Sequence, residues 1–489
     1  MKLKLKRLII DAGKSIALID KSTAAKLDAY VGDRLILSFN GRKSTCIVDI
    51  VSSSLGSNEL YCSIDVLEYL KLKPGNLVNV NLAPEPISKE FISKKMIGKE
   101  LSKKEIYSII EDISKNSLTE AEISYFVLGV YQKGMSFRET LDLTEAMYKT
   151  GKILKWNKNL KVVDKHCIGG IPGNRTTPIV VSICASAGLT MPKTSSRAIT
   201  SAAGTADTIE TIAKVDFPIS ELKKIVSKTG ACLAWGGSLG MAPSDDKLIR
   251  IERLLDLDPE SQLIASIISK KLAAGSKYVL IDIPCGEGAK VTKSEAIKLK
   301  SKFEKVCKAF KLNVTILITD GQQPIGNGIG PVLEMIDVLR VLKRENSPLD
   351  LEKKSLLLSG KILEIAGKAN SGEGYSLARR ILESGDAHKK FEQIIAAQGK
   401  NKNTLKTGKF FHSILANKSG VIKKISNHDI NHMSRLLGCP TDKSAGIYLF
   451  KHVKEKVSSK DKLLTFYSES DKKLKEAINY YKSHKTFVF

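Results

Sequence analysis

The sequence predicts an α/β protein with a mixed, largely parallel sheet at its centre, and two observations carry this prediction. Strand-like runs rich in Val and Ile alternate with helical stretches between residues 161 and 345, a pattern typical of a sheet covered on both faces. Polar, glycine-rich segments follow three of these runs, which end near residues 166, 284 and 320. Because ligands of such sheets bind beyond the carboxyl ends of the strands, we expect a binding site at that edge.

Residues 1–84 are expected to form a small β-rich, barrel-like domain with a structural or oligomerising role. Apolar and polar residues alternate in four predicted strands, near residues 2–10, 34–39, 44–51 and 77–83. Two segments, which begin at Ser22 and Ser63, each have the pattern of a short helix, a glycine turn and a strand. Either an internal duplication that builds a pseudo-symmetric barrel or two unrelated units would produce this pattern.

Residues 85–160 are expected to form a helical subdomain. Ser102, Thr119 and Ser136 are each followed three positions later by a glutamate. This is the capping box, in which two side chains satisfy backbone N–H groups at the start of a helix. Residues 346–489 are expected to form a helical connection, up to about residue 400, and then an α+β C-terminal domain.

The chain of 489 residues carries a formal charge of +26, which raises the question of nucleic-acid binding. Aromatic residues make up only 6% of the sequence, the lysines are scattered, and no RNA-recognition or zinc-finger pattern is found. We therefore assign the charge to a lysine-rich proteome and an anionic small substrate, and we expect no nucleic-acid partner.

The eight cysteines stand singly, without any C-x-x-C pair, which argues against a zinc site and a disulfide framework and for a reducing cytoplasm. The longest weakly polar run, residues 178–192, is shorter than the roughly 20 residues that span a bilayer. We expect a cytoplasmic protein without a membrane partner, a metal or a cofactor.

The stretch from Val163 to Glu210 has the clearest site pattern. Lys165 and His166 end a predicted strand and run directly into a glycine turn and a helix. Backbone N–H groups at such a turn, beside a lysine and a helix N-terminus, form a site for a phosphate-sized anion. A second loop, residues 193–205, surrounds Arg197 with hydroxyl and small side chains, so we expect it to approach a ligand closely, with Arg197 as a fork for a substrate phosphate.

Five ordered motifs resemble the thymidine phosphorylase/AMP phosphorylase family, over nearly the whole chain. They are DKHCIGGIPGN at 164–174, PKTSSRAITSAAGTADT at 192–208, APSDD at 242–246, DLDPESQLIASIISKK at 256–271 and DIPCGEGAK at 282–290. The resemblance implies a class II nucleoside phosphorylase fold, related to anthranilate phosphoribosyltransferase. It also implies phosphorolysis, in which inorganic phosphate displaces a base from C1′ of a nucleoside or nucleotide, and a homodimer or larger homo-oligomer.

The resemblance also implies roles for individual residues. Phosphate contacts are expected from Lys165, Cys167, Gly169, Gly170, Thr177, Ser195 and Thr205. Substrate contacts are expected from Gly170, Ser196, Arg197, Ala198, Ile199, Thr200, Ser201, Thr205, Ser266 and Lys290. Catalytic roles are expected for Lys165, His166 and Asp258, the last as the proton donor to the leaving base. By itself, Asp258 before Pro259 is also the pattern of a plain helix N-cap.

Two departures from the pattern of thymidine phosphorylases bear on which substrate the protein uses. Cys167 stands where thymidine phosphorylases usually have a serine, a departure shared with the AMP branch. The arginine that thymidine enzymes place about fifteen residues before the serine matched by Ser266 falls here on Ile251. The leading prediction is therefore an AMP-type nucleotide phosphorylase. The alternatives are a thymidine phosphorylase and, in a different class, a basic nucleic-acid-binding protein on a lapsed enzyme fold.

Overall fold

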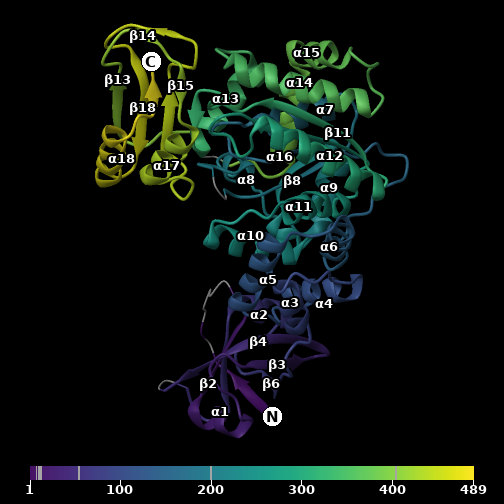
Figure 1. Ribbon diagram of the computed structural model, residues 1–489. Coiled ribbons are helices and arrows are strands. Elements are labelled where there is room, and N and C mark those ends of the chain that lie inside the picture. The colour runs from purple at the N-terminus through teal and green to yellow at the C-terminus, as the bar shows by residue number, and fades with distance from the viewer. Residues whose placement is uncertain (7, 9–13, 53–54, 199–200, 402–404) are drawn as a thin grey trace. The chain divides into compact units, whose positions relative to one another are not determined.

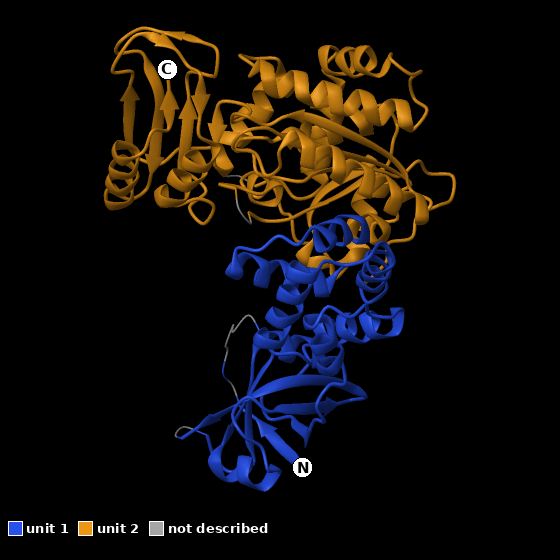
Figure 2. Cartoon of the chain, viewed as in Figure 1, with its two compact units in different colours: residues 1–151, 242–269 blue, residues 152–241, 270–489 orange. Residues whose placement is uncertain are grey.

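The computed structural model describes the chain except residues 7, 9–13, 53–54, 199–200 and 402–404. Two compact units result, which Figure 2 shows in different colours. Unit 1 comprises residues 1–151 and 242–269, and unit 2 comprises residues 152–241 and 270–489. The chain therefore leaves unit 1 after the helical subdomain, returns for a short helical insertion, and leaves again within one helix.

The N-terminal part of unit 1 is a closed six-stranded barrel (Figure 1). Its strands are β1 (Lys2–Leu5), β2 (Ile16–Asp20), β3 (Arg34–Phe39), β4 (Arg42–Val51), β5 (Glu59–Cys62) and β6 (Leu77–Leu82), in the order β1-β5-β2-β4-β3-β6. Alternate residues point inward to a core that includes Leu3, Ile19 and Val80. The expectation of a small barrel is confirmed, and β2 and β5 add to the predicted strands.

The barrel has an internal two-fold pattern. Exchanging β1, β2 and β3 with β4, β5 and β6 leaves every strand pairing unchanged, including the two parallel pairs β1–β5 and β2–β4. Helix α1 (Lys21–Leu27) follows β2, and helix α2 (Ile64–Leu70) follows β5 at the equivalent point. The topology therefore favours the duplication over two unrelated units. The cap of α1 is Asp20, which accepts from the N–H groups of Ser22 and Thr23.

The rest of unit 1 is helical. It contains α3 (Ser88–Met96), α4 (Lys103–Ser114), α5 (Glu120–Lys133), α6 (Phe137–Lys149), α10 (Pro243–Leu255) and the first part of α11 (Glu260–Ala273). The three predicted capping boxes are confirmed at the starts of α4, α5 and α6. One apolar core joins α4 to α10, through residues such as Ile110 and Ile251. The insertion at 242–269 thus completes the helical subdomain.

Unit 2 is built on parallel strands. They are β7 (Val163–Cys167), β8 (Met191–Ser195), β9 (Ala231–Trp235), β10 (Tyr278–Cys285) and β11 (Asn313–Asp320). β10 lies between β11 and β7, β8 pairs with β9, and a parallel bridge between Val162 and Thr190 links the two groups. The sequence did not predict β8 or β9. Four of the five residues of β8 are polar or small, so it lacks the apolar pattern of a strand, and β9 is only five residues long.

Helices pack around this sheet. They are α7 (Thr176–Ser186), α8 (Thr205–Ile209), α9 (Ile219–Thr229), α12 (Lys293–Ala309), α13 (Pro331–Lys343), α14 (Leu349–Ile365), α15 (Gly374–Glu383) and α16 (Asp386–Ala397), with a 3-10 turn η1 (Gly237–Leu239). Among them, α7, α13, α14, α15 and α16 share one large apolar core with the sheet. The domain boundaries expected from the sequence remain predictions.

The C-terminal part of unit 2 has a core of its own. A four-stranded antiparallel sheet contains β12 (Gly328–Ile329), β16 (Gly446–Leu449), β18 (Lys462–Ser468) and β13 (Phe410–Leu415). Two short pairs join β14 (Gly420–Val421) to β17 (Lys456–Val457) and β15 (Lys424–Ile425) to β19 (Phe487–Val488), and α17 (Asn427–Leu437) packs on α18 (Asp471–Ser483). Within the described ranges, no helix combines the length and the apolarity needed to cross a bilayer.

Candidate active site

Lys165 is the central residue of β7, and its side chain reaches the first turn of α7. Its side chain is almost fully buried, and its Nζ donates to Thr176 Oγ1 at 2.7 Å and Thr177 Oγ1 at 3.4 Å. Burial lowers the pKa of Lys165 to about 8. The sequence placed Lys165 and Thr177 in one anion site, and these two side chains do meet.

Next to Lys165, the buried carboxylate of Asp164 is shared by two buried lysines. Lys271 Nζ lies 2.7 Å from one carboxylate oxygen, and Lys193 Nζ lies 3.2 Å from the other. Burial alone would raise the pKa of Asp164, but Lys193 and Lys271 hold it below its ordinary value. Burial lowers the pKa of Lys271 to about 7. Two buried lysines therefore share the carboxylate of Asp164, and Lys165 lies near a second buried carboxylate, that of Asp282, which pairs with Lys354 at 3.1 Å. Four lysines beside two aspartates leave an excess of positive charge that a bound anion would offset.

His166 and Cys167 complete β7, and both are partly exposed. Burial of the ring nitrogens, together with Lys271 and Lys193, lowers the pKa of His166 well below its usual value. The imidazole is therefore neutral at pH 7 and can donate one hydrogen bond. Burial raises the pKa of the Cys167 thiol, and Asn174 Nδ2 donates to its Sγ at 3.4 Å. Cys167 therefore stays a neutral thiol.

The glycine turn after β7 needs glycine for two reasons. Gly169 and Gly170 have φ values of +97° and +93°, which side chains disfavour. A Cβ at Gly170 would also lie 3.3 Å from the backbone nitrogen of Lys290, and a Cβ at Gly173 would lie 2.4 Å from the carbonyl oxygen of Ile325. The turn therefore packs against the segment that follows β10. This packing places Lys290 next to Gly170, and both residues are predicted substrate contacts.

The second loop, residues 196–204, is closed by Asp207 of α8. One carboxylate oxygen of Asp207 accepts from the N–H of Ala198 at 2.7 Å and from that of Gly204 at 2.8 Å. Within the same loop, Ser201 Oγ donates to the carbonyl of Ala203 at 2.9 Å. Ile199 and Thr200, both predicted substrate contacts, lie outside the described residues. The two ends of the loop are therefore tied to one side chain.

Arg197 and Ser195 have partners within the protein. Arg197 donates to both oxygens of Glu210 at 2.7 Å, lies 3.3 Å from Asp207, and stacks over the ring of Trp235 at 4.8 Å. Ser195 Oγ donates to the carbonyl of Ala234 at 3.3 Å. The guanidinium is thus held in place by carboxylates, and the Ser195 hydroxyl must turn from this carbonyl before it can donate to a phosphate oxygen.

Arg175 is a buried residue of the site that the sequence reasoning missed. It sits at the N-cap of α7 and contacts Glu334, Thr205 and Ala203. Thr205 is a predicted phosphate and substrate contact. An arginine after a Gly-Asn turn resembles a solvated surface residue, and its partner Glu334 lies 159 positions away, so no local pattern could have revealed the pair.

Asp258 and Ser266 belong to unit 1, whereas the other described site residues belong to unit 2. Asp258 lies in the short connection between α10 and α11, and Ser266 lies on α11. The same helix continues into unit 2 with Lys270 and Lys271. Ile251 is buried in the apolar core of unit 1, while the neighbouring Arg250 pairs with Glu120 at 2.6 Å.

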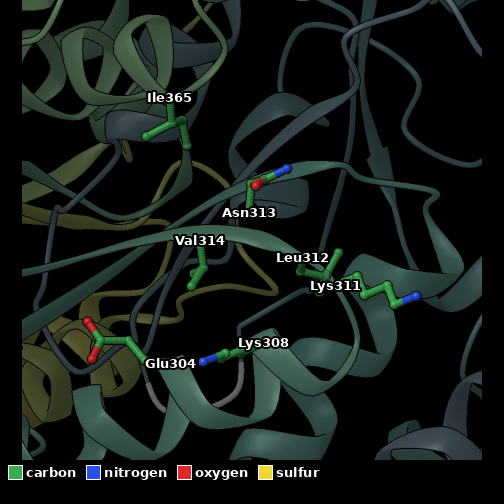
Figure 3. A pocket seen from close by; sticks show the side chains of 7 residues that line it. All are labelled: Glu304, Lys308, Lys311, Leu312, Asn313, Val314 and Ile365. Carbon is green, nitrogen blue, oxygen red and sulfur yellow. The ribbon is translucent and has the colours of Figure 1, made fainter.

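Two cavities are found in unit 2, and the second adjoins these residues, because its lining includes Ile325, which packs against Gly173. One of about 600 Å³ lies at the amino-terminal end of β11, where Figure 3 shows Glu304 and Lys308 of α12 beside Asn313 and Val314. The other, of about 430 Å³, lies beyond the carboxyl end of β11 and is lined by residues including Thr319, Lys354 and Tyr375. We place the site at β7 and β8 nonetheless, because the buried charges gather there. In the described part of the chain, no cluster of His, Cys, Asp or Glu is arranged to hold a metal.

Three family patterns match this chain in order. Residues 89–151 match the helical bundle domain of a glycosyl transferase family, and residues 159–388 match the a/b domain of that family. Residues 421–487 match the pyrimidine nucleoside phosphorylase C-terminal domain. A crystal structure of anthranilate phosphoribosyltransferase from Thermus thermophilus superimposes with a TM-score of 0.53 at 17% identity, over 63% of this chain and 98% of that one.

Relatives of similar length are much closer in sequence. AMP phosphorylases of Thermococcus sibiricus and Methanocaldococcus jannaschii are 42% and 41% identical, over 98% and 97% of this chain and 96% and 95% of their own. A protein of Ralstonia nicotianae, provisionally named thymidine phosphorylase, is 42% identical over 94% of this chain and 89% of its own.

The fold and these matches define a glycosyltransferase that acts on pentosyl compounds, so the protein is an enzyme of the pentosyltransferase class. The chain belongs to the thymidine phosphorylase/AMP phosphorylase family.

Proposed function

We propose that this enzyme is a nucleotide phosphorylase of AMP type. It would convert a nucleoside 5′-monophosphate and inorganic phosphate into the free base and ribose 1,5-bisphosphate. The proposal that inorganic phosphate binds in this site rests on one observation. Lys193 and Lys271 share the buried carboxylate of Asp164, and Lys165, buried in the same strand as Asp164, donates to two threonine hydroxyls at the start of α7. Buried charge is costly unless it is paired, so such a site favours an anionic ligand.

The choice of a nucleotide over a nucleoside rests on unit 1 and on the relatives. The position that would carry the thymine-binding arginine is Ile251, which is buried in an apolar core. Arg250, beside it, is paired with Glu120. Two of the similar relatives bear the name AMP phosphorylase. These observations support a 5′-nucleotide, with Ser196, Arg197, Ala198, Ile199, Thr200, Ser201, Ser266 and Lys290 as its contacts.

The reaction divides between two groups of residues. Lys165, the glycine turn and the hydroxyls of Thr177, Ser195 and Thr205 would hold phosphate with one oxygen directed at C1′, which lowers the entropic part of the barrier. The bond from C1′ to the base then breaks as the phosphate oxygen bonds to C1′. Asp258, in its protonated form, would give its proton to the ring nitrogen of the leaving base. His166 would add a neutral hydrogen bond near the developing charge.

Release of free base from AMP, CMP, UMP, uridine and thymidine, measured with and without inorganic phosphate, tests this proposal. We expect release that requires phosphate and is fastest with a 5′-nucleotide, together with formation of ribose 1,5-bisphosphate. Turnover of thymidine alone would overturn the nucleotide assignment. No phosphate-dependent release from any of the five compounds would overturn phosphorolysis and favour a binding role for the basic chain.

We also propose that the enzyme acts in the cytoplasm as a homodimer or larger assembly, without a metal or cofactor. The presence of eight free cysteine thiols supports a reducing compartment. Light scattering on the purified chain measures the assembly, and a monomer at micromolar concentration would contradict it.

A further inference from the structure

All three guanidinium nitrogens of Arg175 have partners within the protein. Its Nε donates to Glu334 at 2.6 Å, one terminal nitrogen donates to Thr205 Oγ1 at 2.7 Å, and the other donates to the carbonyl of Ala203 at 2.7 Å. Only 8% of the residue is exposed. The side chain thus joins the start of α7 to the loop that precedes α8.

The charge of Arg175 is balanced inside the protein. Glu334 of α13 is almost fully buried, and it also accepts from the N–H of Gly330 and from the hydroxyl of Thr208. Burial raises the pKa of Glu334, while Arg175 acts in the opposite direction. Because the pair is neutral as a whole, Arg175 has no need of a ligand charge. Its effect on a ligand must pass through the groups that it holds.

The important consequence concerns the proton of Thr205. A guanidinium has donors only, so in this contact the Thr205 hydroxyl must be the acceptor. The hydroxyl has one proton, and that proton is left to point to another acceptor. Lys165 has the same effect on Thr176, the residue that follows Arg175, because an ammonium group is also a donor only. The hydroxyl protons of Thr205 and Thr176 are thereby each left for a further acceptor.

We propose that Arg175 is a positioning residue that fixes the Thr205 hydroxyl as a hydrogen-bond donor to the attacking phosphate. This inference rests on the proposed function and adds to it the reason why the site accepts an oxyanion. Phosphate oxygens bearing negative charge only accept hydrogen bonds, so a hydroxyl whose one proton is left free for a ligand matches them.

Two substitutions of Arg175 test whether the side chain at this position must only donate to Thr205, or whether any hydrogen bond to Thr205 is enough. Arg175→Lys remains a donor only, whereas Arg175→Gln also offers an amide oxygen to which Thr205 can turn its proton. Binding of inorganic phosphate to the full chain, measured by calorimetry without nucleotide, should be about 10- to 100-fold weaker for R175Q and nearly normal for R175K. Equal loss in both variants would overturn the proposal, because donor polarity would then be irrelevant.

A double-mutant cycle tests whether the effect passes through Thr205. Thr205→Val removes the hydroxyl and keeps the shape, and Thr205→Ser is the matched control that keeps it. In the T205V background, R175Q should weaken phosphate binding no further. Additive losses, or equal losses in phosphate and nucleotide affinity with a lower melting temperature, would assign Arg175 a structural role only. If R175Q does not fold, T205S and T205V are compared in the R175K background. Loss of phosphate affinity in T205V but not in T205S supports the proposal, and equal affinities overturn it.

These measurements also keep the two proposals apart. A wild-type chain that binds phosphate but releases no base from any compound would overturn the proposed function and leave the role of Arg175 open to the same binding test. Phosphate-dependent turnover with variants that all bind phosphate equally well would overturn only the role of Arg175.

Discussion

At the scale of single residues, burial rather than number makes the lysines of this protein informative. The chain has 78 Lys and Arg residues, most of which lie at the surface. Lys165, Lys193 and Lys271 differ because each is nearly excluded from water at one edge of the sheet. Their desolvated charges interact strongly with a bound anion, since the effective dielectric constant there is low.

The pH dependence of anion binding follows from these lysines. The pKa of Lys165 is lowered to about 8 and that of Lys271 to about 7, so both lose their charge as the pH rises through this range. Binding of a divalent oxyanion should therefore weaken from pH 6.5 to pH 9. Sulfate is the suitable probe, because its own charge is constant there, and its stabilisation of the melting temperature reports binding. Lys165→Met should bind sulfate weakly at every pH. An unchanged sulfate effect across the range would contradict the role of the lysines.

The second residue prediction concerns the proton donor. Asp258→Asn keeps the size of the side chain and removes the acidic proton, so kcat for a nucleotide should fall about 100-fold or more while KM changes little. A ribose 5-phosphate with p-nitrophenol at C1′ is the control, because this leaving group departs without protonation and should be turned over almost normally. Equal losses for both substrates would show that Asp258 acts in some other way.

At the scale of elements, the loop at 196–204 is shaped by contacts rather than by regular structure. Asp207 ties its two ends, and Arg197 joins it to Glu210. The C-terminal part of unit 2 adds Lys443, which lies 2.8 Å from Glu210, and Asn431, which accepts from the N–H of Ala202. The described residues on either side of 199–200 are therefore fixed by side-chain contacts, which reduces the entropy that they would lose on binding a ligand.

Gly204 tests the importance of this loop geometry. A Cβ there would lie 2.5 Å from the carbonyl carbon of Arg197 and from the carbonyl oxygen of Ser196, and neither backbone atom can yield without moving the loop. We expect Gly204→Ala to raise KM for the nucleotide about tenfold and to cost about 1–3 kcal/mol of stability. Gly236→Ala is the matched control, because its nearest neighbours would be 3.7 Å away. Normal KM for G204A would show that the loop does not contact the substrate.

At the scale of the whole molecule, the formal charge of +26 should act on the rate at which substrates arrive. A positive protein attracts an anionic nucleotide over distances that salt screens. We expect kcat/KM for a 5′-nucleotide to fall several-fold as NaCl is raised from about 20 to 300 mM, at fixed phosphate concentration. The uncharged nucleoside is the control and should show little salt dependence in any residual turnover. Equal salt effects on both would point to an effect on phosphate or on the fold.

The strongest local patterns were enough to predict much of the fold. The capping boxes of α4, α5 and α6 and the Val- and Ile-rich runs of β10 and β11 are read within a few residues of sequence. β2, β5, β8 and β9 are only four or five residues long. Such strands acquire their conformation from their neighbours in the sheet, so their own residues contain little signal.

The sequence by itself determined that an α/β sheet places Lys165, the glycine turn and a hydroxyl-rich loop at one edge, because strand and turn patterns are local. Only the tertiary structure decided which charges meet. Arg197 was expected to bind a ligand phosphate, and it is held by Glu210 and Asp207. Arg175 had no predicted role, and it holds Thr205 from within the core. Ion pairs between residues far apart in the chain depend on how helices and strands pack, and this packing determines which cations remain for a ligand.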